Sequence, residues 1–156
     1  MLYYVELETI VGQVYIIADE DAIVEIQFAQ ENKSLGDAQQ QETPLLHEAK
    51  RQLEEYFAGQ RASFSLPLNP QGTEFQKKVW QQLEAIPYGE TRSYGQIAAA
   101  VGNPKACRAV GGANHNNPIA IVIPCHRVIG ANGKLTGYGG GLDIKEKLLK
   151  LEGILE

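Results

Sequence analysis

The spacing of apolar residues predicts a strand-rich start and a helix-rich remainder. Three early segments are rich in Val, Ile and Tyr with partial alternation, which is typical of strands: residues 2–7, 12–18 and 22–28. A polar stretch over 30–42 predicts a loop. Thr43 and Pro44 then provide the N-cap and first position of a helix whose apolar face runs to Phe57, and Gly59 ends it.

The second half predicts helices separated by turns. A short strand is expected over 63–68, and turn residues at 69–72 mark a boundary between two domains, 1–69 and 70–156. Capping-box patterns and apolar spacing then predict four helices: one from 73 that Pro87 ends, 93–101, about 105–113, and 144–151. The expected fold is therefore α/β, with a small sheet-and-helix domain followed by a mostly helical domain.

Charge is distributed unevenly between these halves. Residues 1–69 hold four Lys or Arg against twelve Asp or Glu, whereas residues 70–156 hold ten against seven. No acidic residue lies between Glu90 and Asp143. An acid-free surface with dispersed cations accepts phosphates, although chance in a Gly- and Ala-rich stretch would give the same pattern. The overall charge of −5 taken alone argues weakly against a nucleic-acid partner.

Composition narrows the remaining classes of protein. A chain of 156 residues with 44% hydrophobic residues suits one compact unit or two small domains. No apolar run approaches the ~20 residues that span a bilayer, and the N-terminus lacks a signal-peptide pattern, so a cytoplasmic protein without a membrane partner is expected. Cys107 and Cys125 are too few for a disulfide framework and too far apart for a zinc site. Reduced thiols, no metal and no cofactor are therefore expected.

The second and third predicted helices are joined by a turn at 102–104, which makes them a helix-turn-helix candidate. An ordinary helical hairpin is the commoner outcome of such a pattern. The later helix carries Arg108 with Gly111, Gly112 and Ala113, and each glycine costs about 1 kcal/mol of helix stability relative to alanine. These small residues indicate that a backbone approaches something closely, either DNA or another part of the protein.

A cysteine follows the most apolar stretch of the second half. Residues 119–123 form a strand-like run, and Pro124, Cys125 and His126 come directly after it. A cysteine is more often a small buried hydrophobe than a nucleophile. Here Pro124 interrupts the run and can aim the thiol out of the core, while His126 can remove its proton to give the nucleophilic thiolate. Adjacent strand residues point to opposite faces, so a direct contact between Cys125 and His126 needs a bend, or else a water between them.

This part of the chain resembles the O6-alkylguanine-DNA alkyltransferases. The active-site signature of that family is matched by Pro124-Cys125-His126-Arg127-Val128-Ile129, and further elements match in order across residues 73–153: 89–94, 102–105, 108–113, Asn117-Pro118, 138–142 and Lys145-Glu146. The N-terminal part is similar to the ribonuclease-H-like domain of the family only in its sheet-then-helix pattern. The resemblance implies DNA repair by a monomer that acts once on double-stranded DNA. It would transfer the alkyl group of O6-alkylguanine irreversibly to Cys125, with O4-alkylthymine as a further candidate lesion.

The resemblance also implies roles for residues around the cysteine. Cys125 takes the alkyl group, His126 acts as a base through a bound water, and Glu146 orients that histidine. Asn117 orders the site through hydrogen bonds, and Tyr94 hydrogen-bonds the guanine and helps to neutralise it as it leaves. Without the resemblance, Glu146 would be interpreted as a solvated helix residue, Asn117 as a turn residue and Tyr94 as core packing.

Arg108 is implied to enter the duplex and to fill the gap left by the flipped guanine. This insertion from the minor groove differs from the major-groove docking common among helix-turn-helix proteins. The other DNA-binding positions implied by the resemblance are Ser93, Lys105, Ala109, Gly111, Gly112 and Arg127. Binding is expected to be modest and salt-sensitive, because few cations face the phosphates.

The chain departs from the family pattern in two places. Some members bind zinc in the N-terminal domain, but no cysteine precedes Cys107 here, so no zinc is expected. Gly139 stands where some relatives have serine, which would change hydrogen bonding to the alkylated oxygen and the tolerance for larger alkyl groups. Cys107 lies outside the signature and is assigned no chemistry.

Three other functions fit parts of the sequence. A module that recognises lesions without repairing them would lack the nucleophilic cysteine, so the presence of Cys125 argues against it. A cysteine hydrolase with a Cys–His–Glu relay would need an oxyanion hole and repeated turnover, and it leaves Arg108 unexplained. A purely structural domain leaves the ordered motifs unexplained.

Overall fold

The first part of the chain folds into a four-stranded sheet. In the computed structural model, which describes residues 1–136, 138 and 140–156, the strands are β1 (Tyr3–Thr9), β2 (Gly12–Ala18), β3 (Ile23–Phe28) and β4 (Gln39–Gln40). The first three form an antiparallel meander, and β4 adds a short parallel partner to β1, which gives the order β3-β2-β1-β4. The first three predicted strands are therefore present within two residues of their expected ends.

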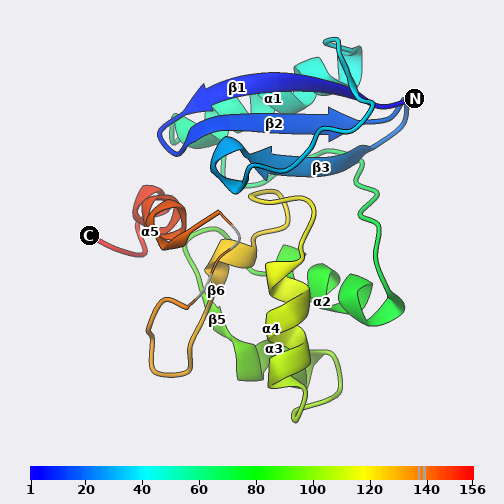
Figure 1. Ribbon diagram of the computed structural model, residues 1–156. Helices are drawn as coiled ribbons and strands as arrows, with labels where there is room; N and C mark the ends of the chain where they lie inside the picture. The colour runs from blue at the N-terminus through cyan, green and yellow to red at the C-terminus, as the bar shows by residue number, and fades with distance from the viewer. Residues whose placement is uncertain (137, 139) are drawn as a thin grey trace.

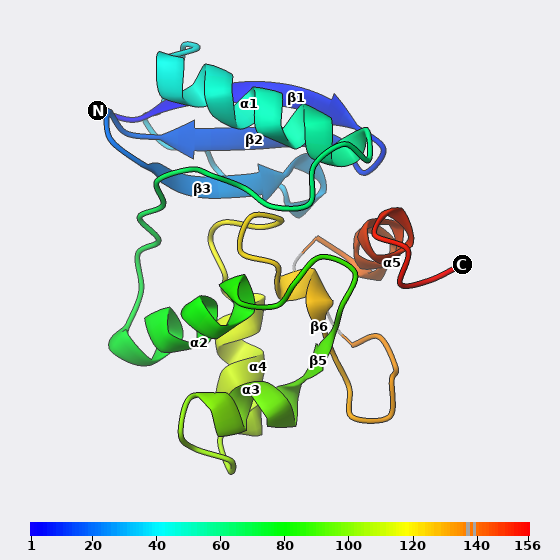
Figure 2. The ribbon, with the colours of Figure 1, turned by 180° about the vertical axis from the view of Figure 1, so that it is seen from behind.

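Helix α1 (Pro44–Phe57) covers one face of this sheet, as seen in Figure 2. The Thr43 hydroxyl accepts a hydrogen bond from the backbone N–H of Leu46, and Pro44 occupies the first turn. Both features place the start of the helix where the sequence predicts it. Its buried side chains are Leu46, Ala49, Gln52, Leu53 and Tyr56.

The second part of the chain is mostly helical, as Figure 1 shows. Its helices are α2 (Glu74–Glu84), α3 (Tyr94–Ala100), α4 (Cys107–His115) and α5 (Leu142–Leu151). Helices α2, α3 and α4 pack on one another, and the Trp80 indole N–H donates to the Ala113 carbonyl at 2.8 Å. Two short parallel strands, β5 (Arg92–Ser93) and β6 (Val128–Ile129), connect α3 to the segment after Cys125. The α/β prediction, with a sheet domain followed by a helical domain, is confirmed.

One loop prediction and two strand predictions need correction. The stretch over 30–42 contains β4 and the end of a 3-10 turn, η1 (Ala29–Glu31). Residues 63–68 do not form a strand, and only Leu68 makes an isolated bridge to Ile23. Pro67 lacks a backbone N–H and so cannot extend a ladder of hydrogen bonds there. The apolar run over 119–123 is also not a strand, because it folds into consecutive turns.

The loop before Cys125 reaches the sheet domain. The backbone N–H of Ile26 in β3 donates to the Pro118 carbonyl at 2.9 Å, and an isolated bridge joins Ile26 to Ile119. In Figure 1 this loop rises toward β3, and α5 lies near the same boundary between the domains. The fold therefore places the cysteine between the two domains.

Candidate active site

Cys125 begins a 3-10 turn, η2 (Cys125–Arg127), and its side chain is almost fully buried. Asn117 stabilises the loop that leads into this turn through hydrogen bonds. The Asn117 amide donates to the Ile123 carbonyl at 2.8 Å, and its oxygen accepts the backbone N–H of Ile119 at 3.0 Å. Asn117 therefore orders the loop that presents the cysteine, which is the kind of role implied by the resemblance.

The turn before the cysteine contains an unusual backbone conformation. Ile121 has φ of +72°, in the left-handed region that a β-branched residue rarely adopts. Such a conformation costs of order 1–3 kcal/mol and persists only where its surroundings hold it. Hydrogen bonds from the Val122 N–H to the Ala120 carbonyl and from the Ile123 N–H to the Ile119 carbonyl close the turn on both sides.

The surroundings of the Cys125 thiol act on its pKa in opposite directions. Burial raises the pKa, whereas hydrogen bonding from Asn117 and Tyr138 and the positive charge of Lys145 lower it. The net direction is upward, so Cys125 is a protonated thiol at rest and needs a base to become a nucleophile.

His126 lies next to the cysteine and is completely buried. Its Nε2 is 2.6 Å from Oε2 of Glu152, just beyond the end of α5, and both side chains have no exposed area. Its Nδ1 has no hydrogen-bond partner among the described residues. A carboxylate at Nε2 fixes the proton on that nitrogen, so Nδ1 is the nitrogen that can accept a proton.

The expectation that Glu146 orients His126 is therefore wrong. Glu146 is half-exposed on α5, where it pairs with Lys150 at 3.3 Å. The buried stripe of α5 runs through Lys145, Leu148 and Leu149, and Glu152 continues it four residues after Leu148. Helical spacing alone was a signal that could have identified Glu152, whereas Glu146 falls on the opposite face.

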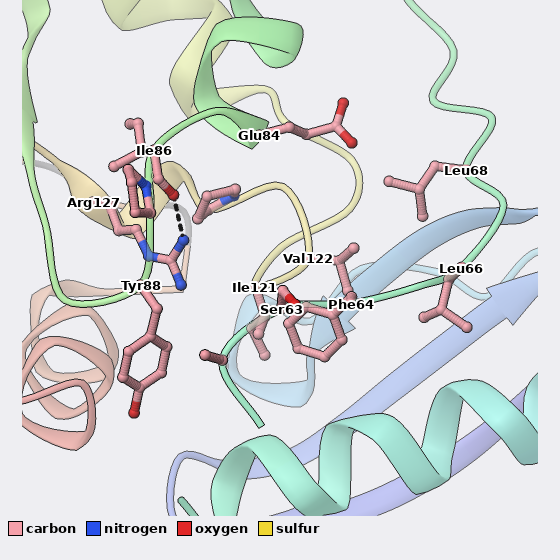
Figure 3. Close-up of a pocket in the computed structure, with 13 residues that line it drawn as sticks. Ser63, Phe64, Leu66, Leu68, Glu84, Ile86, Tyr88, Ile121, Val122 and Arg127 are labelled. Carbon is pink, nitrogen blue, oxygen red and sulfur yellow. Dashed lines mark hydrogen bonds between the residues drawn. The ribbon is translucent and has the colours of Figure 1, made fainter. Parts of the chain in front are cut away.

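Arg127 also differs from its expected role. It was expected at the DNA surface, but it is buried, with Nε 2.8 Å from Oε1 and Nη2 3.1 Å from Oε2 of Glu152. Its Nη1 donates to the Ile86 carbonyl at 2.7 Å, the contact dashed in Figure 3. Because every nitrogen of its guanidinium is committed inside the protein, Arg127 is not available to phosphates.

The ion pair between Arg127 and Glu152 determines the protonation states of Glu152 and His126. Burial alone would raise the pKa of Glu152, but hydrogen bonds from His126, Arg127 and Tyr56, together with positive charge nearby, lower it to about 2. Burial lowers the pKa of His126, and the charges of Arg127 and Lys145 add to that effect against the attraction of Glu152. One guanidinium already balances one carboxylate, so His126 is neutral at neutral pH and able to accept a proton.

Lys145 is a buried cation close enough to Cys125 for their charges to interact. Its Nζ donates to the Val128 carbonyl at 2.7 Å, and its side chain has no exposed area. Burial lowers its pKa to about 8, while the neighbouring Cys125 opposes this shift. A positive charge here favours the thiolate over the thiol.

The space beside the thiol is small. A cavity of about 10 Å³ next to Cys125 has room for about one water molecule. Both domains line it, with Phe28, Glu31, Asn114, His115, Asn117, Ala120, Cys125, Tyr138 and Gly140. Gly139, expected to influence alkyl size, lies outside the described residues. A purine base requires this cavity to open.

A larger hollow of about 200 Å³, drawn in Figure 3, lies between the domains behind Pro124. Its walls include Phe64, Leu66, Tyr88 and Val122, with Arg127 along one side. Among the described residues that line it, Cys125 is absent, so this hollow is separate from the space at the thiol.

The remaining predicted site residues lie on and around α3 and α4. The Tyr94 hydroxyl is 2.5 Å from the hydroxyl of Thr136, and the Ser93 side chain caps α3 by accepting the Gln96 N–H. Four of the residues implied to bind DNA are exposed: Lys105, Arg108, Ala109 and Gly112. Gly111 is half-buried.

The glycines of α4 are not required by contacts inside the protein. A Cβ on Gly112 would meet no described atom within 4 Å, and one on Gly111 would only touch the Tyr94 ring at 4.0 Å. Internal packing was one of two explanations for these small residues, and it does not apply to Gly112. The exposed face of α4 is thus free for close approach by another molecule.

Comparison with known proteins identifies the family. A family model described as 6-O-methylguanine DNA methyltransferase, ribonuclease-like domain, matches residues 2–70, and one described as its DNA binding domain matches 74–154. The chain is 56% identical over 154 residues to the methylated-DNA–protein-cysteine methyltransferase of Methanosarcina acetivorans, covering 97% of this chain and 99% of that protein. It is 54% identical over 160 residues to the constitutive methylated-DNA–protein-cysteine methyltransferase of Bacillus subtilis, covering 99% and 97%.

A solved structure gives the same result. The crystal structure of Mycobacterium tuberculosis OGT in complex with DNA matches with a TM-score of 0.90 and 45% identity, over 96% of this chain and 92% of that one. The two-domain fold places a buried cysteine, followed by a histidine that is bonded to a glutamate, at the boundary between the domains. The chain belongs to the 6-O-methylguanine DNA methyltransferase family of enzymes.

Metal-binding groups and membrane-spanning helices bear on other classes of protein. In the described part of the chain, no group of three or more His, Cys, Asp or Glu side chains could hold a metal ion. None of the helices over the described residues is long and apolar enough to cross a membrane.

Proposed function

We propose that this chain repairs DNA by moving the alkyl group of O6-alkylguanine onto Cys125 in one irreversible step. The observation that carries the proposal is a buried thiol followed in the chain by a buried His126, whose Nε2 is bonded to Glu152 and whose Nδ1 is unpartnered among the described residues. A histidine held in this way removes the thiol proton, directly or through a water. The names of the relatives, methylated-DNA–protein-cysteine methyltransferase, support the same chemistry.

The reaction balances without a cofactor. The proton of the Cys125 thiol passes to Nδ1 of His126, and the thiolate sulfur attacks the alkyl carbon. A sulfur–carbon bond forms as the carbon–O6 bond breaks, and the electron pair of that bond stays with guanine. The base then takes up a proton, with the Tyr94 hydroxyl as the proposed hydrogen-bond donor to it. The product is a thioether, which does not hydrolyse under mild conditions, so each molecule acts once.

The DNA part of the proposal rests on α3 and α4. The alkylated oxygen lies inside the duplex, so the guanine must be flipped out, which costs a few kcal/mol. We assign Arg108 to the gap in the base stack, and the small face of Gly111 and Gly112 to close approach at the minor groove. The proposed contacts around them are Ser93, Lys105 and Ala109. The structure of the mycobacterial relative with DNA supports DNA as the partner.

The proposal extends to properties that follow from the family resemblance. The chain acts as a cytoplasmic monomer, its two helices α3 and α4 work as a helix-turn-helix, and O4-alkylthymine is a second substrate because it carries the same alkyl–oxygen bond.

The test is the intact mass of the protein after incubation with a duplex containing one O6-methylguanine. The expected result is one added methyl group per molecule, located on Cys125 by peptide mapping, and no gain in a Cys125→Ser variant. Tight binding without a mass change would instead indicate a protein that only recognises lesions. Repaired DNA beside unmodified protein would indicate a turnover enzyme such as a hydrolase, and Cys125 would not be the final acceptor.

A further inference from the structure

The N-terminal domain places one polar atom in the buried centre of the site. The hydroxyl of Tyr56, near the end of α1, lies 2.5 Å from Oε2 of Glu152, and both side chains are buried. This is a direct contact between the sheet domain and the carboxylate that holds His126. No motif in the sequence points to Tyr56, since the elements that match the family signature lie after residue 73.

The ring of Tyr56 is fixed by other aromatic side chains. It packs against Phe57 at 5.2 Å, Phe64 at 5.5 Å and Tyr88 at 6.2 Å between ring centroids. Such packing leaves the hydroxyl little freedom to point elsewhere. The position of the hydroxyl is therefore set by the aromatic cluster and not by its hydrogen bond alone.

The hydrogen bond at Glu152 has a definite direction. Burial and the nearby Glu152 charge raise the pKa of Tyr56 far above its ordinary value, so the phenol keeps its proton and donates it. Oε2 of Glu152 thus receives three donors, from Tyr56, from Nε2 of His126 at 2.6 Å and from Arg127 at 3.1 Å. Two of these belong to η2, and only Tyr56 comes from the other domain.

A donor that shares the charge of a carboxylate weakens its pull on every other partner. The Tyr56 hydroxyl takes up part of the negative charge on the same oxygen that His126 contacts. It therefore limits how strongly Glu152 stabilises the protonated histidine. It also fixes the direction in which Oε2 can accept, and so the orientation of the imidazole ring.

We propose that Tyr56 is a positioning residue for alkyl transfer, supplied by the N-terminal domain, which orients Glu152 and thereby sets the basicity of His126. The inference rests on the proposed function and deepens it, because it makes the sheet domain part of the proton-transfer machinery. The charged and titratable groups that act on Tyr56, Glu152 or His126 are Arg127 from η2, Lys145 from α5, Tyr88 before β5, and Tyr138.

The test is the pH dependence of the single-turnover transfer rate in Tyr56→Phe. Phenylalanine keeps the ring in its cluster and removes only the hydroxyl. Glu152 then attracts the imidazolium more strongly, the pKa of His126 rises, and the acidic limb of the profile moves to higher pH by roughly half a unit or more. At a pH on that limb the rate falls roughly threefold or more, since half a unit is about a factor of three.

Tyr88→Phe is the matched control. Its ring belongs to the same cluster, but its hydroxyl donates to the Leu151 carbonyl at 3.3 Å and not to Glu152. This variant is expected to leave the acidic limb in place. A loss of packing would lower stability in either variant without moving the limb, so the pH profile separates positioning from a structural role.

Site-specific 3-fluorotyrosine at position 56 provides a second variant should phenylalanine disturb folding. Fluorine makes the phenol a stronger donor, and the acidic limb is expected to move to lower pH, opposite to Tyr56→Phe. An unshifted limb in both variants, with transfer by the wild type intact, overturns the role of Tyr56 and leaves the proposed function standing. Absence of transfer to Cys125 in the wild type overturns both.

Discussion

Helices α1 and α4 differ in the features of their sequences that stabilise a helix. Helix α1 has 14 residues, a Thr43 cap, a proline in its first turn, and an arginine, Arg51, bonded to Glu48 and Glu55 on its surface. Helix α4 has nine residues, and its N-cap, Ala106, makes no side-chain cap. Packing explains the buried side of both helices, but stability and packing do not explain the exposed Arg108 and Gly112 of α4.

This difference between the helices shows that α4 contains residues that lower helix stability. Two adjacent glycines in α4 cost about 1 kcal/mol each relative to alanine, and Gly112 faces open space. Small, uncharged residues next to an exposed Arg108 suit a surface that another molecule approaches closely. Helix α1 instead faces inward, and at Tyr56 it reaches Glu152. Helix α1 thus contributes to the interior of the site, whereas α4 is the helix that we propose to contact the DNA.

The largest change in the free energy of unfolding is expected at Glu152, the carboxylate that Tyr56 of α1 contacts. The pKa of Glu152 is about 2 in the folded protein against 4.5 ordinarily, so the folded state favours its charged form. That stability is fully present above about pH 4.5 and is lost as the pH falls toward 2, and it amounts to about 3 kcal/mol. Glu152→Gln is therefore expected to lower the free energy of unfolding by about that amount at pH 7, measured by urea denaturation.

The matched control for this prediction is Glu146→Gln on the same helix. Glu146 is half-exposed and pairs only with Lys150, so its loss should leave the free energy of unfolding unchanged. The gap between Glu152→Gln and the wild type should close as the pH is lowered from 4.5 to 2. A gap that stays constant over this range would mean that Glu152 is not the ionised centre of the network.

The next prediction compares the loss of an arginine on α4 with the loss of an arginine on α1. Arg108→Ala is expected to slow repair of O6-methylguanine in a duplex about a hundredfold. Without the arginine, no side chain fills the gap left by the flipped base, and flipping costs a few kcal/mol. Transfer from O6-methylguanine supplied as the free base, which needs no flipping, should keep its rate. Arg51→Ala, which removes the guanidinium paired on α1, should change neither rate. Equal losses on both substrates in Arg108→Ala would place its defect in the chemistry and not in DNA handling.

Regular periodicity made most of the fold predictable. The alternation of β1 to β3 and the Thr43-Pro44 start of α1 gave elements close to those observed. The run over 119–123 was interpreted as a strand because a short apolar run does not distinguish a strand from buried turns. Nothing in the sequence indicates that Ile121 adopts a left-handed conformation, since that is imposed by the hydrogen bonds of the surrounding loop.

The site was predictable as far as its motif and no further. The motif identified Cys125 and His126, and Asn117 holds the loop before them. The motif points to the wrong carboxylate, because Glu146 belongs to the matched Lys145-Glu146 element, whereas position on the helix points to Glu152. It also took Arg127 for a DNA contact, since a sequence does not show which cations are paired inside. Tyr56 depends on tertiary packing of two domains, which no local pattern encodes.

The smallest effect is expected at Gly112, and it is the sharpest test of the contrast between the helices. Gly112→Ala adds a Cβ that meets nothing within 4 Å, so it should stabilise the protein by about 1 kcal/mol. The same methyl group should weaken binding to duplex DNA several-fold, measured by fluorescence anisotropy at fixed salt, because it stands on the approaching face.

Thr43→Ala on α1 supplies the opposite result. Loss of this cap should destabilise the protein by about 1 kcal/mol and leave the affinity for DNA unchanged. Gly112→Ala on α4 would then raise stability and lower the affinity for DNA, whereas Thr43→Ala on α1 would change stability alone. If Gly112→Ala gains stability and keeps full affinity, the glycine is not explained by DNA, and the exposed face of α4 does not lie at the minor groove.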